Sequence, residues 1–366
     1  MRRDYILATV ALLIAWVVPT ALYGQPMALW TDSVYNYGTF HESDGEQRAT
    51  FVVVNTGDSP LVITRVQPTC GCTVARFTTT AIAPGESGMV NVTYSPTGRP
   101  GPFEKTVWVY TNSVPNRTRL TIKGITIGAE GTVAKYFPEH AAHLVATQTT
   151  LAAGEVTKGL IRNNVVTLYN PTRDSVAVAF DNNTSHINIV AKPDTIVPGG
   201  ISTICFFFNS QRTPVWGIND DTITMITHPV GKDDDTQKSK FNLVANVVED
   251  FSNLTNEQLV QAPVCTVSDH KIMLGDGDIA GDNPLVASLE LTNTGKSDLV
   301  VHRIMTLDTA MSGACDKTLV KLGEKAIVTI KIDPTKVKDD VLNSDFTIIT
   351  NDPVNPRIVV RVVGKK

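Results

Sequence analysis

Two cysteines separated by one glycine, Cys70 and Cys72 in the stretch PTCGCT, are the residues whose type and spacing best suit chemistry. Such a pair can close into a disulfide, exchange with another thiol, or hold a soft ion such as Cu(I). A disulfide across three residues contributes at most about 1 to 2 kcal/mol, and ring strain makes it easier to reduce. Two interpretations remain: a thiol pair or labile disulfide that shapes a loop, and a redox or copper site.

The surroundings of the pair favour the loop interpretation. A reactive thiol needs cationic groups nearby, and Arg76 is the one close candidate along the sequence. Residues i and i+2 of a flat strand lie about 6.5 to 7 Å apart, at or beyond the disulfide limit, so a bridge requires a bend at Gly71. We expect both cysteines to be solvent-accessible and to serve the loop without catalysing a reaction.

The three other cysteines are spread along the chain. Cys205 lies in an apolar run, ISTICFFFN, and is expected to act as a small buried hydrophobe. Cys265 and Cys315 form a candidate disulfide that would close a loop of about 50 residues, worth roughly 4 kcal/mol in the chain-entropy model.

Other polar groups suggest metal ligands but lack complete ligand sets. His140 and His143 lie three apart beside Glu139, whereas zinc needs three or four ligands. The loop LGDGDIAGDNP carries Asp276, Asp278 and Asp282, but it departs from the EF-hand pattern, and calcium needs six to eight oxygens. These groups are interpreted as solvated loops. No catalytic motif is found, so the sequence predicts no enzyme, no cofactor and no metal site.

Five triplets of Asp, Ser or Thr, and an aliphatic residue resemble the O-glycosylation sequon of Bacteroidota. The candidate acceptors are Ser33, Ser175, Thr195, Thr222 and Thr309. Glycans at exposed positions would add bulk and solubility.

The first residues resemble a signal peptide. Arg2 and Arg3 precede an apolar run from Ile6 to Val18, which is too short to span a bilayer. Cleavage is predicted between Gly24 and Gln25, and the mature chain carries no other run long enough to span. Export permits disulfides.

Composition places the chain among globular proteins of several domains. It has 366 residues, 42% of them hydrophobic and 19% charged, with a net charge of −4. Nucleic-acid binding usually leaves a basic footprint, which this charge does not provide.

An internal repeat organises the sequence. NTGDSPLVITRV, which begins at Asn55, matches NTGKSDLVVHRI, which begins at Asn293, at seven of twelve positions and an offset of 238 residues. YNPTRDSVAV, from Tyr169, begins a weaker middle copy. Three copies of about 95 to 100 residues indicate three domains in tandem.

Within each copy the hydrophobic period is two. Val90, Val92 and Tyr94 alternate with polar residues, as expected for a strand with one buried face. Turn signals separate such runs, and no segment has a convincing helical period. We therefore predict an all-β fold: a signal peptide (1–24) and three tandem immunoglobulin-like β-sandwiches (25–128, 129–250 and 267–366), with a linker at 251–266.

The first copy resembles a known family. NTGDSPLVITRVQPTCGCT, followed by IAPGESGMVNVTYSPTGRPGPFEKTVWVYTNS, is similar to the DUF1573 family of exported bacterial proteins. The resemblance implies a sandwich related to the ASH, MSP and PapD-type folds and an envelope location, and it implies no reaction.

The favoured hypothesis is a non-enzymatic, exported scaffold that binds protein partners in the cell envelope, in the periplasm, at the outer membrane or on the cell surface. The alternative is a thiol redox or copper-carrying protein built on Cys70 and Cys72.

Overall fold

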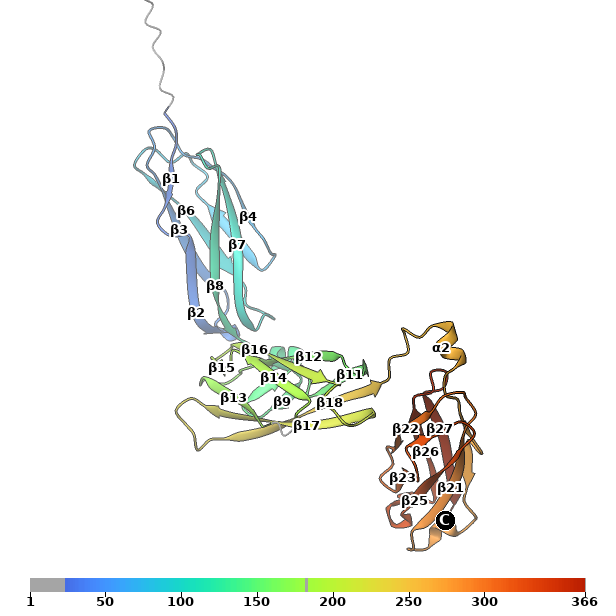
Figure 1. The fold of residues 1–366 in the computed structure, drawn as a ribbon. Coiled ribbons are helices and arrows are strands. Elements are labelled where there is room, and N and C mark those ends of the chain that lie inside the picture. The colour runs from blue at the N-terminus through green and yellow to red at the C-terminus, as the bar shows by residue number, and fades with distance from the viewer. Residues whose placement is uncertain (1–23, 182–183, 366) are drawn as a thin grey trace, which may run out of the picture. The chain divides into compact units, whose positions relative to one another are not determined.

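The structure is a computed structural model that describes residues 24–181 and 184–365 (Figure 1). The predicted signal peptide lies outside the described residues, apart from Gly24. The chain divides into two compact units, one up to Thr126 and one from Ile127 onwards. Among the described residues, no helix is long and apolar enough to cross a membrane.

The first unit is a sandwich of two four-stranded sheets, with strand orders β1-β3-β6-β5 and β2-β8-β7-β4 (Figure 1). The strands are β1 (Ala28–Trp30), β2 (Val34–His41), β3 (Gln47–Asn55), β4 (Ile63–Pro68), β5 (Thr73–Phe77), β6 (Ser87–Tyr94), β7 (Gly101–Thr111) and β8 (Arg117–Ile127). A 3-10 turn spans Glu42–Asp44. Strands β4 and β5 are edge strands, one in each sheet.

The second unit contains two further sandwiches. In the second sandwich the strand orders are β14-β16-β12-β10-β9 and β11-β18-β17-β13-β15. Its elements are α1 (Glu130–Tyr136), β9 (Glu139–Ala141), β10 (Leu144–Ala146), β11 (Thr150–Thr157), β12 (Ile161–Tyr169), β13 (Val176–Asp181), β14 (Ile187–Lys192), β15 (Thr195–Ile196), β16 (Ile201–Asn209), β17 (Gly217–Pro229) and β18 (Gln237–Val248).

The third sandwich has strand orders β19-β21-β25-β23 and β20-β27-β26-β22-β24. It follows α2 (Asn256–Val260) and comprises β19 (Cys265–Val267), β20 (Lys271–Met273), β21 (Leu285–Asn293), β22 (Leu299–Thr306), β23 (Met311–Cys315), β24 (Leu319–Val320), β25 (Lys325–Ile332), β26 (Val341–Thr350) and β27 (Arg357–Lys365). 3-10 turns span Asp278–Ala280 and Pro334–Lys336. The prediction of an all-β chain of tandem immunoglobulin-like sandwiches is confirmed.

Buried and more exposed residues alternate along the strands with the period of two that the sequence shows. Val90, Val92 and Tyr94 in β6 face the core, as do Val328 and Ile330 in β25. Because successive side chains of a strand point to opposite faces, this alternation buries one face of each sheet against its partner.

A buried asparagine at the start of the NTG segment recurs in each sandwich. The Asn55 side chain donates to the carbonyls of Ser59 (2.8 Å) and Ile82 (2.9 Å). Asn293 donates in the same way to Ser297 and Val320, and Asn170 to Asp174 and Ile196. The weak middle copy of the repeat is therefore built like the other two.

Two features differ from the sequence prediction. The helices α1 and α2, in the joins between sandwiches, had no helical signal in the sequence. Val133 and Phe137 anchor the first: Phe137 stacks on the Tyr169 ring at 5.0 Å. The third sandwich also begins earlier than predicted, because Cys265 and Thr266 already pair with β21.

Candidate functional site

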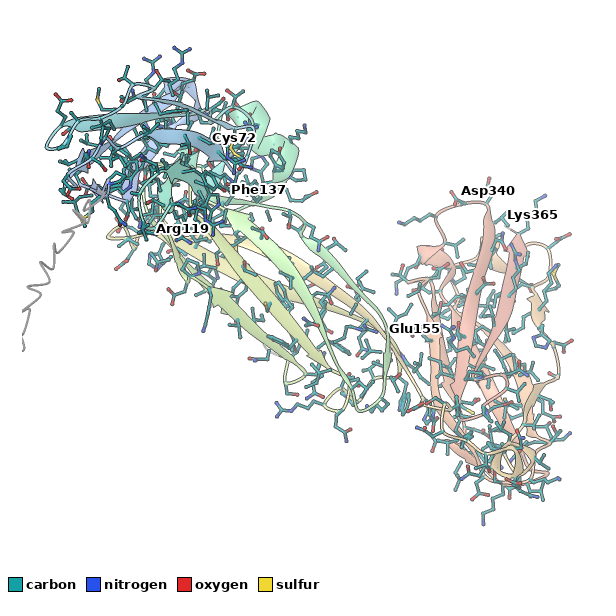
Figure 2. All side chains as sticks on the ribbon, turned by 90° about the horizontal axis from the view of Figure 1, so that it is seen from above. Cys72, Arg119, Phe137, Glu155, Asp340 and Lys365 are labelled. Carbon is teal, nitrogen blue, oxygen red and sulfur yellow. A yellow bond between two sulfur atoms is a disulfide. The ribbon has the colours of Figure 1, made fainter. Side chains whose placement is uncertain are left out.

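The Cys70 and Cys72 sulfurs form a disulfide in the turn that joins β4 to β5 (yellow in Figure 2). The chain crosses between the two sheets of the first sandwich here, so the bridge lies at a corner flanked by two edge strands. The Cα atoms are 5.3 Å apart, closer than residues i and i+2 of a flat strand. The turn is also closed by Thr73 N–H, which donates to the Cys70 carbonyl (3.3 Å).

The expectation that both cysteines are accessible is wrong for Cys72. Cys72 is only 6% exposed and belongs to the core of the first sandwich, whereas Cys70 is half-buried at the edge of that core. The reason is the bend at the corner, which turns Cys72 inward while Gly71 stays exposed. The Thr73 hydroxyl lies 3.6 Å from each sulfur.

The third sandwich makes the same turn without cysteine. Asp308 and Ala310 stand at the positions of Cys70 and Cys72, and Met311 N–H donates to the Asp308 carbonyl (3.1 Å) as Thr73 does to Cys70. The Asp308 carboxylate accepts from Ala310 N–H (2.8 Å) and from the Ser344 hydroxyl. One sandwich closes this corner covalently, and the other closes it with a carboxylate.

Arg76, the cation nearest to the pair in sequence, does not face the disulfide. It alternates with Ala75 and Phe77 in β5 and lies with Arg48 and Asn91 on the outer face of its sheet. Cys72 points to the opposite side, into the core.

The predicted Cys265–Cys315 disulfide is not formed: both are free thiols. Strands β19 and β23 are the two opposite edges of one sheet, and β21 and β25 separate them. Burial, with the charges of Asp352 and Cys315, raises the pKa of Cys265 to about 12. Cys205 is also not in the core as expected, since it is half-buried on the face of β16 that points away from Ile204 and Phe206.

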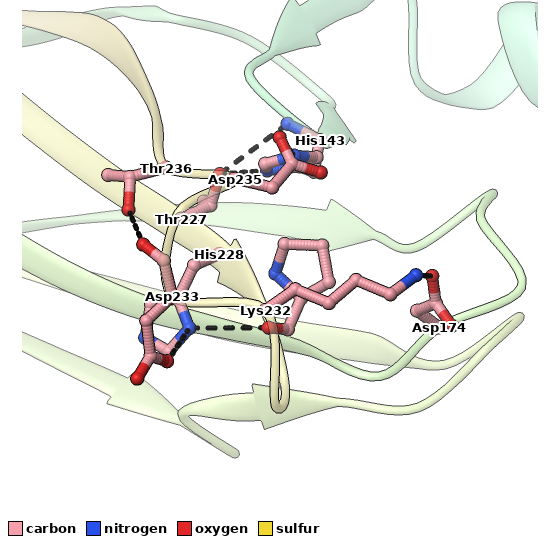
Figure 3. A network of polar contacts seen from close by, with 9 residues as sticks. His143, Asp174, Thr227, His228, Lys232, Asp233, Asp235 and Thr236 are labelled. Atoms are coloured by element: carbon pink, nitrogen blue, oxygen red, sulfur yellow. Dashed lines mark hydrogen bonds and ion pairs between the residues drawn. The ribbon is translucent and has the colours of Figure 1, made fainter.

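His143 belongs to a polar network rather than to a metal centre (Figure 3). Its Nδ1 lies 2.8 Å from the Thr227 hydroxyl, and its Nε2 lies 3.1 Å from Asp235. Both ring nitrogens are thus engaged, and His140 lies exposed in β9. Among residues 24–181 and 184–365, no group of three His, Cys, Asp or Glu side chains is placed to hold a metal ion.

The Thr227–His143–Asp235 array has the residue types of a nucleophilic triad but the reverse exposure. Thr227 is fully buried, whereas the side chain of Asp235 is 53% exposed. A nucleophilic hydroxyl must reach a substrate, so this array is suited to hold the β17–β18 hairpin. Lys232 adds an ion pair with Asp174 at 2.7 Å (Figure 3).

The remaining sequence candidates lie at the surface. Asp278 accepts a hydrogen bond from Gly275 N–H (2.7 Å) and so closes its own loop; Asp276 and Asp282 are exposed. At the predicted cleavage site, the Gly24 carbonyl accepts from the Ser59 hydroxyl (2.8 Å), and Gln25 is exposed. Four of the five glycosylation candidates are exposed, namely Ser33, Thr195, Thr222 and Thr309, while Ser175 is half-buried.

Two family models match separate parts of the chain. Residues 28–126 match the model of DUF1573, a family of proteins of unknown function, and residues 279–365 match that of HYDIN/CFA65/VesB-like Ig-like domains. The predicted resemblance of the first copy is therefore confirmed. No curated protein matches the chain.

Several solved structures are similar to this chain at low identity. One is a protein of unknown function from Porphyromonas gingivalis W83 (18% identity, TM-score 0.48), covering 61% of this chain and 100% of its own. A PapD-like domain of human CEP192 (11%, 0.26) covers 30% of this chain and 88% of its own. The periplasmic chaperone SfaE (14%, 0.24) covers 61% and 98%. Because each TM-score is below 0.5, nothing about the fold or the activity of this chain is argued from these similarities.

Proposed function

We propose that this chain is a non-enzymatic, exported protein-binding scaffold and an accessory component of a cell-envelope assembly. The observation that carries the proposal is the corner of the first sandwich, where a disulfide sets a turn between the edge strands β4 and β5. Edge strands present backbone groups that a partner strand can pair with, and a rigid turn beside them adds a shaped contact.

The compartment belongs to the same proposal. A basic start followed by a short apolar run directs export, and a disulfide persists in an oxidising compartment. The periplasm, the outer membrane and the cell surface all meet this condition.

A thiol redox or copper-carrying role is the second candidate, since Cys70 is half-exposed at the surface. Buried Cys72 and the outward direction of Arg76 argue against it. Redox catalysis needs an accessible thiolate whose pKa is lowered by nearby positive charge, and Arg76, the cation nearest to the pair in sequence, lies on the outer face of its sheet.

The test compares the wild-type chain with a Cys70→Ser/Cys72→Ala variant, both tagged and produced in the native host. After cross-linking in the envelope fraction, we expect wild type to retain a stoichiometric protein partner. In parallel, insulin-reduction turnover and Cu(I) titration of the purified chains are expected to be the same for both. Turnover or tight stoichiometric copper binding that is lost in the variant would establish the second candidate instead.

A further inference from the structure

Besides the Cys70–Cys72 turn, one outer face of the first sandwich carries a group of arginine and aromatic residues. Strands β4, β7 and β8 align Arg65, Tyr110 and Arg117 in one cross-strand row, with Trp108 and Arg119 in the next. Arg65, Arg117 and Arg119 are exposed (Arg119 is labelled in Figure 2). We call the five residues Arg65, Trp108, Tyr110, Arg117 and Arg119 the arginine face.

Two of the three guanidinium groups of this face are held by aromatic rings. Arg65 lies over the Tyr110 ring at 4.1 Å, and Arg117 lies over the Trp108 ring at 4.2 Å. Desolvation raises the pKa of the Tyr110 hydroxyl, but hydrogen bonds from Arg117 and Arg65 and their charge outweigh it, so its pKa is lowered. Stacking leaves the N–H edges of a guanidinium free to donate.

The charges of the face have no counter-charge within the described part of the chain. None of the ion pairs there involves Arg65, Arg117 or Arg119. Arg65 and Arg117 are therefore preorganised by their rings, and all three cations are available to an acceptor outside the first sandwich.

The third sandwich carries an equivalent row of residues, and the contacts of that row are seen in the structure. Arg303, Ile349 and Arg357 form the equivalent row, and the same β-bulge precedes Arg303 in β22 and Arg65 in β4. Within the second unit this row contacts the second sandwich. Arg303 donates to the carbonyls of Trp216 (3.0 Å) and Ile218 (2.9 Å).

The contact is completed by a carboxylate and by close packing. Arg357 pairs with Glu155 at 3.2 Å. A Cβ added to Gly217 would collide with the end of the Ile349 side chain, which shows how closely the two sandwiches approach. On the third sandwich, then, the row docks on strand-end carbonyls and a carboxylate of another β-sandwich.

The residue types of the arginine face favour a protein over other anionic partners. Arg, Trp and Tyr dominate the binding energy of protein interfaces, where Lys is depleted. A polysaccharide, nucleic acid or anionic lipid surface could be bound as well by lysine, but this face uses arginine stacked on rings.

We infer that the arginine face is the docking surface for a partner protein whose β-sandwich offers strand-end carbonyls and a carboxylate, as the second sandwich offers them to the third. This inference rests on the proposed protein-binding function and identifies the surface and the chemistry of its partner.

The experiment places a photo-cross-linking residue at Gln67, which is exposed and paired with Trp108, and a control at Thr50 on the outer face of the opposite sheet. Both full-length chains are produced in the native host and irradiated, and the product is identified by mass spectrometry. We expect one protein to cross-link at Gln67, through a peptide that contains Asp or Glu, and not at Thr50.

Charge reversal supplies the matched comparison. Arg65→Glu with Arg117→Glu should lower the Gln67 product, and the affinity of the purified partner, by about tenfold or more. Arg48→Glu with Arg76→Glu makes the same charge change on the opposite sheet and should leave both unchanged. Circular dichroism melting curves check that every variant is folded.

The outcomes separate the inference from the proposed function. An undiminished product in the Arg65/Arg117 variant, or a product that contains only glycan, nucleic acid or lipid, overturns the inference. Protein captured at Thr50 but not at Gln67 overturns it while the scaffold function stands. No protein product at either position overturns both.

Discussion

At the scale of single residues, a buried amide holds each copy of the repeat together. Asn55 bridges the carbonyls of Ser59 and Ile82, which lie 4 and 27 residues further along the chain. It therefore ties the NTG turn to the turn at Pro84 and Gly85, called the PG turn. A buried polar group left without its partner costs about 1 to 3 kcal/mol.

Replacing this amide should therefore be costly. Asn55→Ala leaves the Ser59 carbonyl without its donor and the Gly57 N–H without its acceptor, and it removes one of two hydrogen bonds to the Ile82 carbonyl. We expect the free energy of unfolding of the first sandwich to fall by roughly 2 to 4 kcal/mol. Urea titration followed by Trp fluorescence measures the loss. Asn91→Ala, at an exposed position of the same sheet, should change it by less than about 0.5 kcal/mol; equal losses in both variants would contradict the role of the buried amide.

The turn at Cys70 and Cys72 should also fold when it is closed by an aspartate carboxylate, as the equivalent turn of the third sandwich is. Cys70→Asp/Cys72→Ala copies Asp308 and Ala310, so we expect it to be more stable than Cys70→Ser/Cys72→Ala, which lacks both closures. The latter should lose no more than about 2 kcal/mol relative to wild type. Thermal and urea unfolding rank the three chains, and an equal ranking of the two variants would mean that the carboxylate does not close this turn.

The free thiols should differ in reactivity. Because the thiolate is the nucleophile, the raised pKa of Cys265, about 12, together with its burial should make its alkylation about a hundredfold or more slower than that of Cys205. Iodoacetamide labelling of native protein at pH 8, read by peptide mass spectrometry, measures both rates. In denaturant the difference should vanish. Similar rates in the native chain would show that Cys265 is accessible.

At the scale of elements, the two short helices in the joins are held differently. Helix α1 is anchored by Val133 and by the stack of Phe137 on Tyr169, whereas Leu259 and Val260 of α2 are 40% and 62% exposed. Few buried contacts imply easy local opening.

Limited proteolysis should distinguish helix α1 from helix α2. Thermolysin, which cuts before apolar residues, is expected to cut at Leu259 or Val260 and to leave α1 intact. A fragment of about 100 residues, the third sandwich, should survive. Phe137→Ala should open α1 to the same protease. Cuts inside the NTG or PG turns before any cut in the linker would contradict the domain boundaries.

At the scale of the whole molecule, the glycosylation candidates are distributed over all three sandwiches. Ser33, Thr195, Thr222 and Thr309 are exposed and accessible to a transferase. Protein from the native host should therefore exceed its polypeptide mass, and alanine at these four positions should restore that mass. Intact mass spectrometry is the measurement. A wild-type mass equal to that of the bare mature chain would contradict glycosylation at these positions.

The sequence by itself determined the number of sandwiches, the fold class and the equivalence of the NTG segments. These follow from local information: a period of two, turn residues and an offset of 238 residues all survive in the unfolded chain. The Arg65 and Arg303 equivalence was contained in the same offset, but its meaning required knowledge of which strands lie side by side.

Only the tertiary structure decided which side chains meet. Cys265 and Cys315 suit a disulfide by count, yet sheet order puts them on opposite edges. His143 finds its partners 84 and 92 residues away, and the arginine face joins residues from three strands. Strand register and sheet order set such contacts, and a shift of one residue would move each side chain to the other face. Spacing along the chain does not carry that information.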